Sequence, residues 1–276
     1  MVTDVARPHT RVSTTEIIQD IVAWLRTQFE ESNAQRFVLG LSGGIDSAVV
    51  CGLCARAAGP ERVLGVIMPS NSNPDDAQSA SLVATAFKVP TVSVDLTDVT
   101  ERFYAAMPEQ DALVEALGAG HGEMWLDAQY LATANVRPRL RMTTLYYLAN
   151  LCGGLVAGTG NKSEASVGYY TKYGDGGVDL FPIIDLFKFE VRAVASELGV
   201  PQSVIDRPPS AGLWQDQTDE EELGISYKAL DEILIAMEHG DTTGLDDALV
   251  ERVATMNRVS EHKRRPVPAF KRHPSS

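Results

Sequence analysis

The stretch GLSGGIDSAVVCGL, residues 40–53, decides how this chain is expected to fold. A short apolar run leads into Ser42-Gly43-Gly44, and a second apolar stretch begins at Ala48. Glycine adopts backbone conformations that are closed to other residues, which lets amide N–H groups approach phosphate oxygens closely. The serine hydroxyls add donors, and the N-terminus of a following helix favours an anion. The stretch therefore predicts a strand, a phosphate-binding turn and a helix.

Asp46 is the unusual residue of this turn. The common phosphate-binding pattern G-x-x-x-x-G-K-[ST] carries a lysine, and here a carboxylate stands where that cation is expected. A helix N-terminus alone contributes only about 0.3–2 kcal/mol, which is too little to hold and activate a triphosphate. A divalent cation must then supply most of the charge compensation. Because Mg²⁺ among phosphates prefers carboxylate ligands, we expect Asp46 to hold it.

Composition and charge narrow the class of protein. The 276 residues are 44% hydrophobic and 22% charged, which is ordinary for a globular chain. The net charge of −13 argues against broad binding to nucleic acid, which needs a basic face. No apolar run approaches the ~18 residues of a membrane helix, and the polar first ten residues do not resemble a secretory signal. We expect a cytoplasmic enzyme that binds neither nucleic acid nor membranes.

The three cysteines, Cys51, Cys54 and Cys152, offer no disulfide framework. Cys51 and Cys54 match C-x-x-C, a spacing found in zinc and redox sites. They have no second pair or nearby histidine pair, and they lie among apolar residues. We interpret both as small buried residues of a helix.

Strands and helices are expected to alternate along the chain. Apolar runs predict strands at residues 36–41, 62–68, 90–95 and 154–158. Helical periodicity predicts helices beginning at residue 14 and spanning 47–56, 75–87, 97–117, 124–150, 188–198, 226–238 and 244–258. This alternation predicts an α/β fold, with one parallel twisted sheet covered by helices on both faces.

One domain is expected over residues 14–276, after a loose N-terminal arm at 1–13. Residues 206–224 combine prolines, glycines and an acidic run, which is typical of a lid loop over a site. The run from Asp216 to Glu222 is expected to be a solvated face of that lid. The basic tail, residues 262–276, is expected to be either a solvated tail or a clamp that one subunit contributes to an anionic ligand bound by its partner.

A second polar segment, GTGNKSEASVGYYTKYGDGGVDLFPI, occupies residues 158–183. Its start superficially matches both a dinucleotide-binding G-x-G and a Walker N-K-S. It lacks the third glycine of the first pattern and the G-K pair of the second, so both are rejected. A polar, glycine-rich run directly after an apolar strand is nevertheless a candidate site.

The motifs together resemble one enzyme family. S-G-G-x-D-S at residues 42–47 resembles the pyrophosphate loop of the N-type ATP pyrophosphatases, which cleave ATP between the α and β phosphates. G-T-G-N-K-S-E followed by Y-T-K-Y-G-D-G-G-V-D is similar to the signature of NAD synthetases. N-V-R-P-R-L-R-M at 135–142 and H-K-R-R-P at 262–266 resemble two further segments of that family. The four ordered motifs cover almost the whole chain and imply a Rossmann-like fold of the adenine nucleotide alpha hydrolase type.

This resemblance implies an ammonia-dependent reaction. The carboxylate of deamido-NAD would attack the α-phosphate of ATP, and ammonia would then displace AMP to give NAD, in the last step of NAD biosynthesis. About 35 residues precede the loop, too few for a glutaminase domain, so free ammonia is the expected nitrogen source. The family also implies a homodimer with substrate sites at the interface.

The resemblance further implies roles for individual residues. The ATP-binding residues would be Gly40, Leu41, Ser42, Gly43, Gly44, Ile45, Asp46, Ser47, Thr159, Lys188 and Ser210. The deamido-NAD-binding residues would be Arg139, Lys172, Asp179, His262 and Lys263. Asp46 and Glu164 would hold Mg²⁺.

Catalysis would rest on Asp46, Lys172, Asp175 and Lys188. Asp175 either orients ammonium or is a plain turn aspartate. Residues 71–76 are given no ligand role. Two alternatives stay open: another adenylating amide-forming synthetase with the same loop, and an adenine-nucleotide sensor without catalysis.

Overall fold

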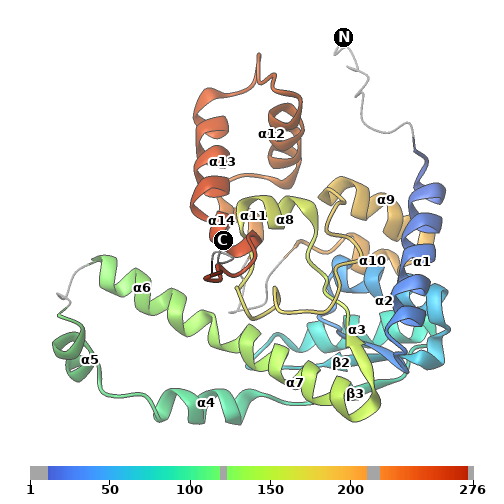
Figure 1. Cartoon of the computed structure of the whole chain (residues 1–276), viewed down its shortest axis with the longest axis horizontal. Coiled ribbons are helices and arrows are strands. Elements are labelled where there is room, and N and C mark those ends of the chain that lie inside the picture. Colours follow the sequence, from blue (N-terminus) through green and yellow to red (C-terminus); the bar gives the residue numbers. More distant parts are fainter. Residues whose placement is uncertain (1–11, 119–122, 210–217, 273–276) are drawn as a thin grey trace.

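The computed structural model describes residues 12–118, 123–209 and 218–272. Four parallel strands form one sheet. These are β1 (Arg36–Gly40), β2 (Val63–Ile67), β3 (Thr91–Ser93) and β4 (Gly154–Val156), in the order β3-β2-β1-β4, of which β2 and β3 are labelled in Figure 1. The register places Val38 beside Leu64 of β2 and Val156 of β4. A parallel bridge between Ala157 and Leu180 continues the pairing beyond β4. The predicted strands are confirmed, with shorter bounds.

Helices fill the connections between the strands and the C-terminal part of the chain. They are α1 (Thr14–Glu31), α2 (Ile45–Ala58), η1 (Pro60–Arg62), α3 (Pro74–Phe87), α4 (Thr97–Ala105), α5 (Gln110–Leu117), α6 (Glu123–Ala134), α7 (Val136–Cys152), α8 (Lys162–Val167), α9 (Lys188–Leu198), α10 (Gln202–Ile205), α11 (Asp219–Leu223), α12 (Tyr227–His239), α13 (Asp247–Val259) and α14 (Glu261–Arg264). None of those helices, within the described ranges, is long and apolar enough to span a membrane.

Both faces of the sheet are buried. Successive side chains of a strand point to opposite faces, so β1 supplies Phe37 and Leu39 to one core and Val38 to another. The first core packs the sheet against α1, α2, α3 and α9, and the second packs it against α7. A third apolar cluster joins α8, α12 and α13. The prediction of an α/β fold with a parallel sheet covered on both faces is confirmed.

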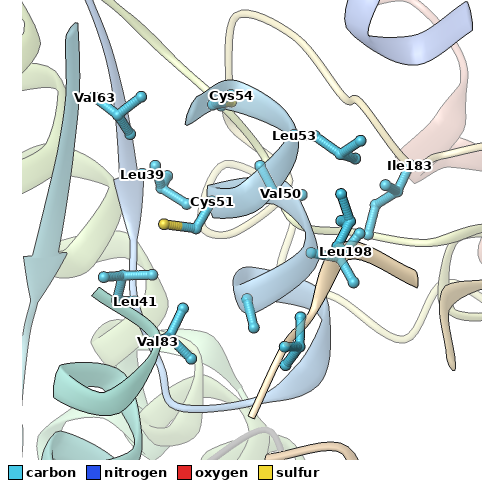
Figure 2. Close-up of a cluster of buried hydrophobic side chains, with 14 of the residues drawn as sticks. Leu39, Leu41, Val50, Cys51, Leu53, Cys54, Val63, Val83, Ile183 and Leu198 are labelled. Atoms are coloured by element: carbon cyan, nitrogen blue, oxygen red, sulfur yellow. The ribbon is translucent and has the colours of Figure 1, made fainter. Parts of the chain in front are cut away.

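The two cysteines of the C-x-x-C spacing are part of the first core. Figure 2 shows Cys51 and Cys54 on α2 among Leu39, Val50 and Leu53. Both are free thiols with no exposed surface. Burial raises the pKa of Cys51 to about 12 and that of Cys54 well above its ordinary value. The interpretation as small buried helix residues is confirmed.

Two helices predicted as continuous are broken. The stretch 97–117 divides into α4 and α5 on either side of Pro108, which has no amide N–H and disfavours helical backbone in the preceding residue. The stretch 124–150 divides at Asn135 into α6 and α7. Pro138 is accommodated because it lies in the first turn of α7, where its missing donor has no helical partner.

Two polar segments contain helices that composition does not predict. The short helix α8 begins with a capping box, in which Asn161 and Glu164 satisfy each other's backbone amides. The helix α11 lies inside the predicted lid loop, and Asp219 in it is only 4% exposed. The expectation of a solvated acidic face is therefore wrong for Asp219. Residues 210–217, and with them the predicted ATP contact Ser210, lie outside the described residues.

Candidate functional site

A pocket of about 920 Å³ lies beyond the carboxyl ends of β1, β2 and β4. In an open parallel sheet, ligands bind at this edge. One wall is formed by the loop after β1 and the first turn of α3, and the other by α7, the turn at residues 168–178 and the C-terminal residues 260–263. A pocket of this size admits a ligand as large as a nucleotide.

The glycines of the loop are needed for both conformation and space. Gly43 has a φ of 82°, in the left-handed region that other residues rarely adopt. A Cβ atom built on it would lie 2.5 Å from the carbonyl oxygen of Asp76. Ser47 Oγ donates to the carbonyl of Gly44 over 3.0 Å, and Ser42 Oγ lies 3.1 Å from Ser47 Oγ. The two predicted serine donors thus lie together inside the turn.

The helix that follows this loop presents its N-terminus to the pocket. Gly44 is the N-cap residue of α2 in extended conformation, and no side chain caps this end. The first backbone amides of a helix have no partner within the helix, and they carry its positive end. The arrangement matches the predicted strand, turn and helix.

Lys188 joins the two carboxylates that were predicted to hold metal. Its Nζ donates to Asp46 Oδ2 over 2.7 Å and to Glu164 Oε1 over 3.0 Å. Asn161 Nδ2 donates to the other oxygen of Asp46 over 2.9 Å, and the ring of Tyr227 lies 4.6 Å from the ammonium. The Lys188 side chain is only 2% exposed. Four separate segments of the chain therefore meet at one charged cluster.

Burial and charge act against each other in this cluster. Burial lowers the pKa of Lys188, but the attraction of Asp46 and Glu164 outweighs it and raises the pKa above its ordinary value. Burial raises the pKa of Glu164 to about 7, although Lys188 opposes the rise. Glu164 is therefore close to the point at which it exchanges a proton near neutral pH.

The two carboxylates fit a magnesium ion that is shared with phosphates. Both contact the same ammonium, so their oxygens converge on one point. No group of three or more His, Cys, Asp or Glu side chains that could hold a metal occurs in the described part of the chain. Mg²⁺ is usually held by one or two carboxylates together with substrate phosphates and water. A pair is thus a sufficient protein contribution.

A hydrogen-bond network that sequence reasoning missed connects this cluster to α11. The hydroxyl of Tyr227 lies 3.2 Å from Glu164 Oε1 and 3.0 Å from Asp219 Oδ2. The hydroxyl of Tyr169 lies 3.1 Å from Asp219 Oδ1 and 2.7 Å from Glu222 Oε2. Burial raises the pKa of Asp219. The acidic run gave no sign of this, because its partners lie outside it in the sequence.

Basic residues line the opposite wall. Lys263 Nζ donates to the carbonyl oxygens of Gly168 and Tyr170, both over 2.6 Å. Lys172 Nζ donates to the carbonyl of His262 over 2.8 Å, and Arg139 lies 3.4 Å from the carbonyl of Lys172. The structure therefore brings together Arg139, Lys172, His262 and Lys263, all of which line the pocket.

Asp175 and Asp179 differ in their position. Asp175 lines the pocket, and its Oδ1 accepts from the amide of Thr171 over 2.8 Å, as a turn aspartate does. Asp179 accepts from the amide of Val156 over 2.7 Å and from the Tyr146 hydroxyl over 3.0 Å. It does not belong to the pocket wall. Within this chain Asp179 holds β4 and α7 together.

The remaining predicted residues lie in or beside the same pocket. Gly40, Leu41, Ile45 and Thr159 line it, with Thr159 just beyond the end of β4. The basic tail begins as the helix α14, and Arg264 donates to the carbonyls of Ala165 and Ser166. The start of the tail is thus fixed against α8.

Comparisons with known proteins show similarity to NAD synthetases over most of the chain. The family model for NAD synthase matches residues 17–267. The NH(3)-dependent NAD(+) synthetase of Carboxydothermus hydrogenoformans is 45% identical over 256 residues, which cover 92% of this chain and 97% of that protein. The protein of the same name from Methanocaldococcus jannaschii is 43% identical over 257 residues, covering 90% and 94%.

Solved structures agree on the fold. The NMN synthetase from Francisella tularensis has a TM-score of 0.79 and 32% identity, covering 94% of this chain and 99% of that chain. The NH3-dependent NAD synthetase from Campylobacter jejuni, in complex with the nitrate ion, has a TM-score of 0.75 and 26% identity, covering 94% and 100%. As its four motifs predicted, this chain belongs to the NAD synthase family of carbon–nitrogen ligases.

Proposed function

We propose that this chain catalyses the ATP-dependent amidation of deamido-NAD with ammonia, giving NAD, AMP and pyrophosphate. The names of its relatives at 43–45% identity support this reaction. One observation carries the proposal: a single pocket joins the phosphate-binding turn and the Asp46 cluster on one side to the basic wall on the other. Such a pocket suits two anionic substrates that must react with each other.

The residues on the first wall suit an adenylation step. An oxygen of the nicotinate carboxylate attacks the α-phosphate, the bond to the bridging oxygen breaks, and pyrophosphate leaves. The loop amides, the Ser42 and Ser47 hydroxyls and Lys188 stabilise the negative charge that builds on the phosphates. Magnesium, when held by Asp46 and Glu164, supplies further charge compensation. ATP would also contact Thr159 and Ser210.

The basic wall suits the other substrate and the second step. The residues that would bind deamido-NAD are Arg139, Lys172, His262 and Lys263. Asp179 would contact the same substrate across the dimer interface. Ammonia attacks the activated carbonyl carbon, and AMP leaves with the electron pair of the carbon–oxygen bond. Asp175 at the pocket wall would orient the ammonium ion and take its proton.

We also propose that the chain works as a homodimer. Large apolar side chains are exposed on α4, α6 and α7. They include Phe103, Leu126, Tyr130, Leu131, Tyr147 and Leu151, which are 41–69% exposed. Monomeric proteins rarely expose a broad apolar patch, so such a surface indicates an interface. Figure 1 shows α5 and the start of α6 at one end of the molecule. Leu131 and Arg139 on this surface also line the pocket, so a partner covering it would lie beside the substrates.

Three further expectations remain proposals. They are a single domain over residues 14–276, a lid at residues 206–224, and a cytoplasmic location. The packing of α11 against the Asp46 cluster through Tyr227 supports a lid that is anchored at its C-terminal end.

A second candidate is amidation of the mononucleotide. The similarity to an NMN synthetase, at 32% identity and a TM-score of 0.79, favours it. Both reactions use the same loop and the same nicotinate carboxylate. They differ in the adenylate half of the substrate.

Product analysis with pure substrates tests the proposal. We expect rapid NAD formation from deamido-NAD, ATP, Mg²⁺ and ammonium, and at least ten-fold slower reaction of nicotinate mononucleotide. Glutamine in place of ammonium should give no turnover. Faster mononucleotide amidation would replace the first candidate by the second, and adenine-nucleotide binding without any amidation would support a sensor.

A further inference from the structure

Arg207 is a cation of the pocket that has no assigned role. Its guanidinium pairs through Nη2 with Asp76 Oδ1, and Nη1 lies 3.4 Å from Ser79 Oγ. Both partners lie in the first turns of α3. The Arg207 and Asp76 side chains are 27% and 25% exposed, and both residues line the pocket.

The turn of α3 that carries the partners of Arg207 packs against the predicted phosphate-binding turn. The carbonyl oxygen of Asp76 and the Cβ of Ser79 lie 2.5 and 2.9 Å from where a Cβ of Gly43 would be. The α3 turn that holds Arg207 is therefore in contact with the turn that is expected to hold the phosphates. Ser42, Gly44 and Ser47 line the same pocket.

Among the described residues, the predicted phosphate-binding turn has few free positive charges to balance a polyphosphate. The turn has no lysine of its own, and Lys188 is already paired with Asp46 and Glu164. Lys172 and Lys263 donate to backbone carbonyls on the opposite wall, and Arg141 donates to Met68 O and Ser72 Oγ. Of the lining cations in the described ranges, Arg207 is the one packed on the α3 turn that covers Gly43.

We infer that Arg207 binds the terminal phosphates of ATP and the pyrophosphate that leaves, and that Asp76 holds it in place in the free protein. A guanidinium presents two parallel N–H donors that match phosphate oxygens, and such charge-assisted pairs are stronger than neutral hydrogen bonds. A polyphosphate carries more negative charge than one carboxylate, so it competes with Asp76 for the guanidinium. This inference rests on the proposed placement of the phosphates.

Calorimetric titration of the full chain with pyrophosphate, ATP and AMP, all with MgCl₂, tests the inference. Arg207→Gln should weaken binding of pyrophosphate and ATP about ten-fold or more, the effect expected for a lost charge-assisted hydrogen bond. AMP has no terminal phosphates, so its affinity should stay within two-fold. Asp76→Asn removes the competing carboxylate and should tighten pyrophosphate binding two-fold or more.

A matched control separates this contact from a shift of the backbone. Arg192 on α9 donates to the carbonyl of Ile205, two residues before Arg207, and does not line the pocket. Arg192→Gln should leave the affinities for pyrophosphate and AMP unchanged. If Arg207→Gln fails to fold, Arg207→Lys decides, because it keeps the charge and loses the paired donors. It should weaken pyrophosphate binding at least three-fold and leave AMP binding unchanged.

Several outcomes would overturn the inference. An unchanged pyrophosphate affinity in the folded Arg207→Gln protein, or equal losses for AMP and pyrophosphate, would remove Arg207 from the phosphate site. So would an Arg192→Gln variant that loses pyrophosphate binding to the same degree. A wild-type chain that binds no ATP would instead remove the proposed function itself.

Discussion

Replacing Lys188 by methionine removes the charge from the centre of the site while keeping a side chain of similar length. The Lys188 side chain is 2% exposed, and its ammonium lies 2.7 Å from Asp46 and 3.0 Å from Glu164. Removing one partner of a buried ion pair leaves an uncompensated charge and costs about 3–5 kcal/mol. Here two carboxylates would remain within about 6 Å of each other, a separation at which like charges still repel. We expect a loss of about 3–5 kcal/mol in the free energy of unfolding at pH 8.

Urea denaturation of the metal-free protein measures this loss, and Lys162→Met is the control. Lys162 also pairs with two carboxylates, at 3.2 and 2.9 Å, and its ammonium also lies 4.6 Å from an aromatic ring. Its partners Asp185 and Glu238 are 90% and 47% exposed, so this pair should contribute about 1 kcal/mol or less.

The effect of MgCl₂ on stability provides a second test of the Lys188→Met variant. A divalent cation satisfies both carboxylates that Lys188→Met leaves behind, so MgCl₂ should stabilise the variant more than the wild type. NaCl at equal ionic strength should not. Equal losses in the Lys188 and Lys162 variants would show that the buried cluster contributes no more than an exposed pair. An equal effect of MgCl₂ on variant and wild type would show that the two carboxylates do not bind the cation.

Three further predictions concern the pH dependence, the phosphate-binding turn and the apolar surface. Because burial raises the pKa of Glu164 from 4.5 to about 7, the folded protein binds this proton more tightly than the unfolded chain, so the stability falls as the pH rises between these values. In metal-free urea titrations, Glu164→Gln should gain about 2–3 kcal/mol relative to the wild type between pH 5 and pH 8, whereas parallel curves would contradict the assignment. Gly43→Ala should reduce stability by about 2 kcal/mol and ATP affinity at least ten-fold, because φ is 82° and Asp76 O lies 2.5 Å from the added atom. The control Gly199→Ala has the same φ and open space around it, so calorimetric ATP binding should be unchanged there. Leu151→Glu on the exposed face of α7 should halve the mass measured by light scattering, while Leu82→Glu on α3 should not; equal masses would place the interface elsewhere.

Local sequence patterns were sufficient to predict the strand, turn and helix that position the site. The strand, glycine turn and helix around residues 40–53 depend on neighbouring residues, so their pattern can be read directly. Pro108 likewise marks the break between α4 and α5, and Asn161 and Glu164 form a readable capping box at α8. Both signals are local, but composition and periodicity do not register them.

Long-range contacts explain what the sequence did not show. Lys188 meets Asp46 across 142 residues, and only the resemblance to a family placed them in one site. The burial of Asp219 depends on Tyr169, 50 residues away, and the pairing of Arg207 depends on Asp76, 131 residues away. No periodicity encodes such pairs, because tertiary packing alone brings them together.

A coupled assay that compares the wild type with Asp46→Asn tests both the proposed reaction and the role of this carboxylate. The reaction contains ATP, MgCl₂, ammonium and deamido-NAD, and an added dehydrogenase reports the NAD formed. We expect NAD and AMP in equal amounts from the wild type. We also expect at least a hundred-fold loss of rate in Asp46→Asn, whose neutral amide removes the charge that pairs with Lys188 and would hold magnesium. A wild type that forms no NAD under these conditions would rule out the proposed amidation, and an Asp46→Asn variant that keeps its rate would rule out the proposed role of Asp46.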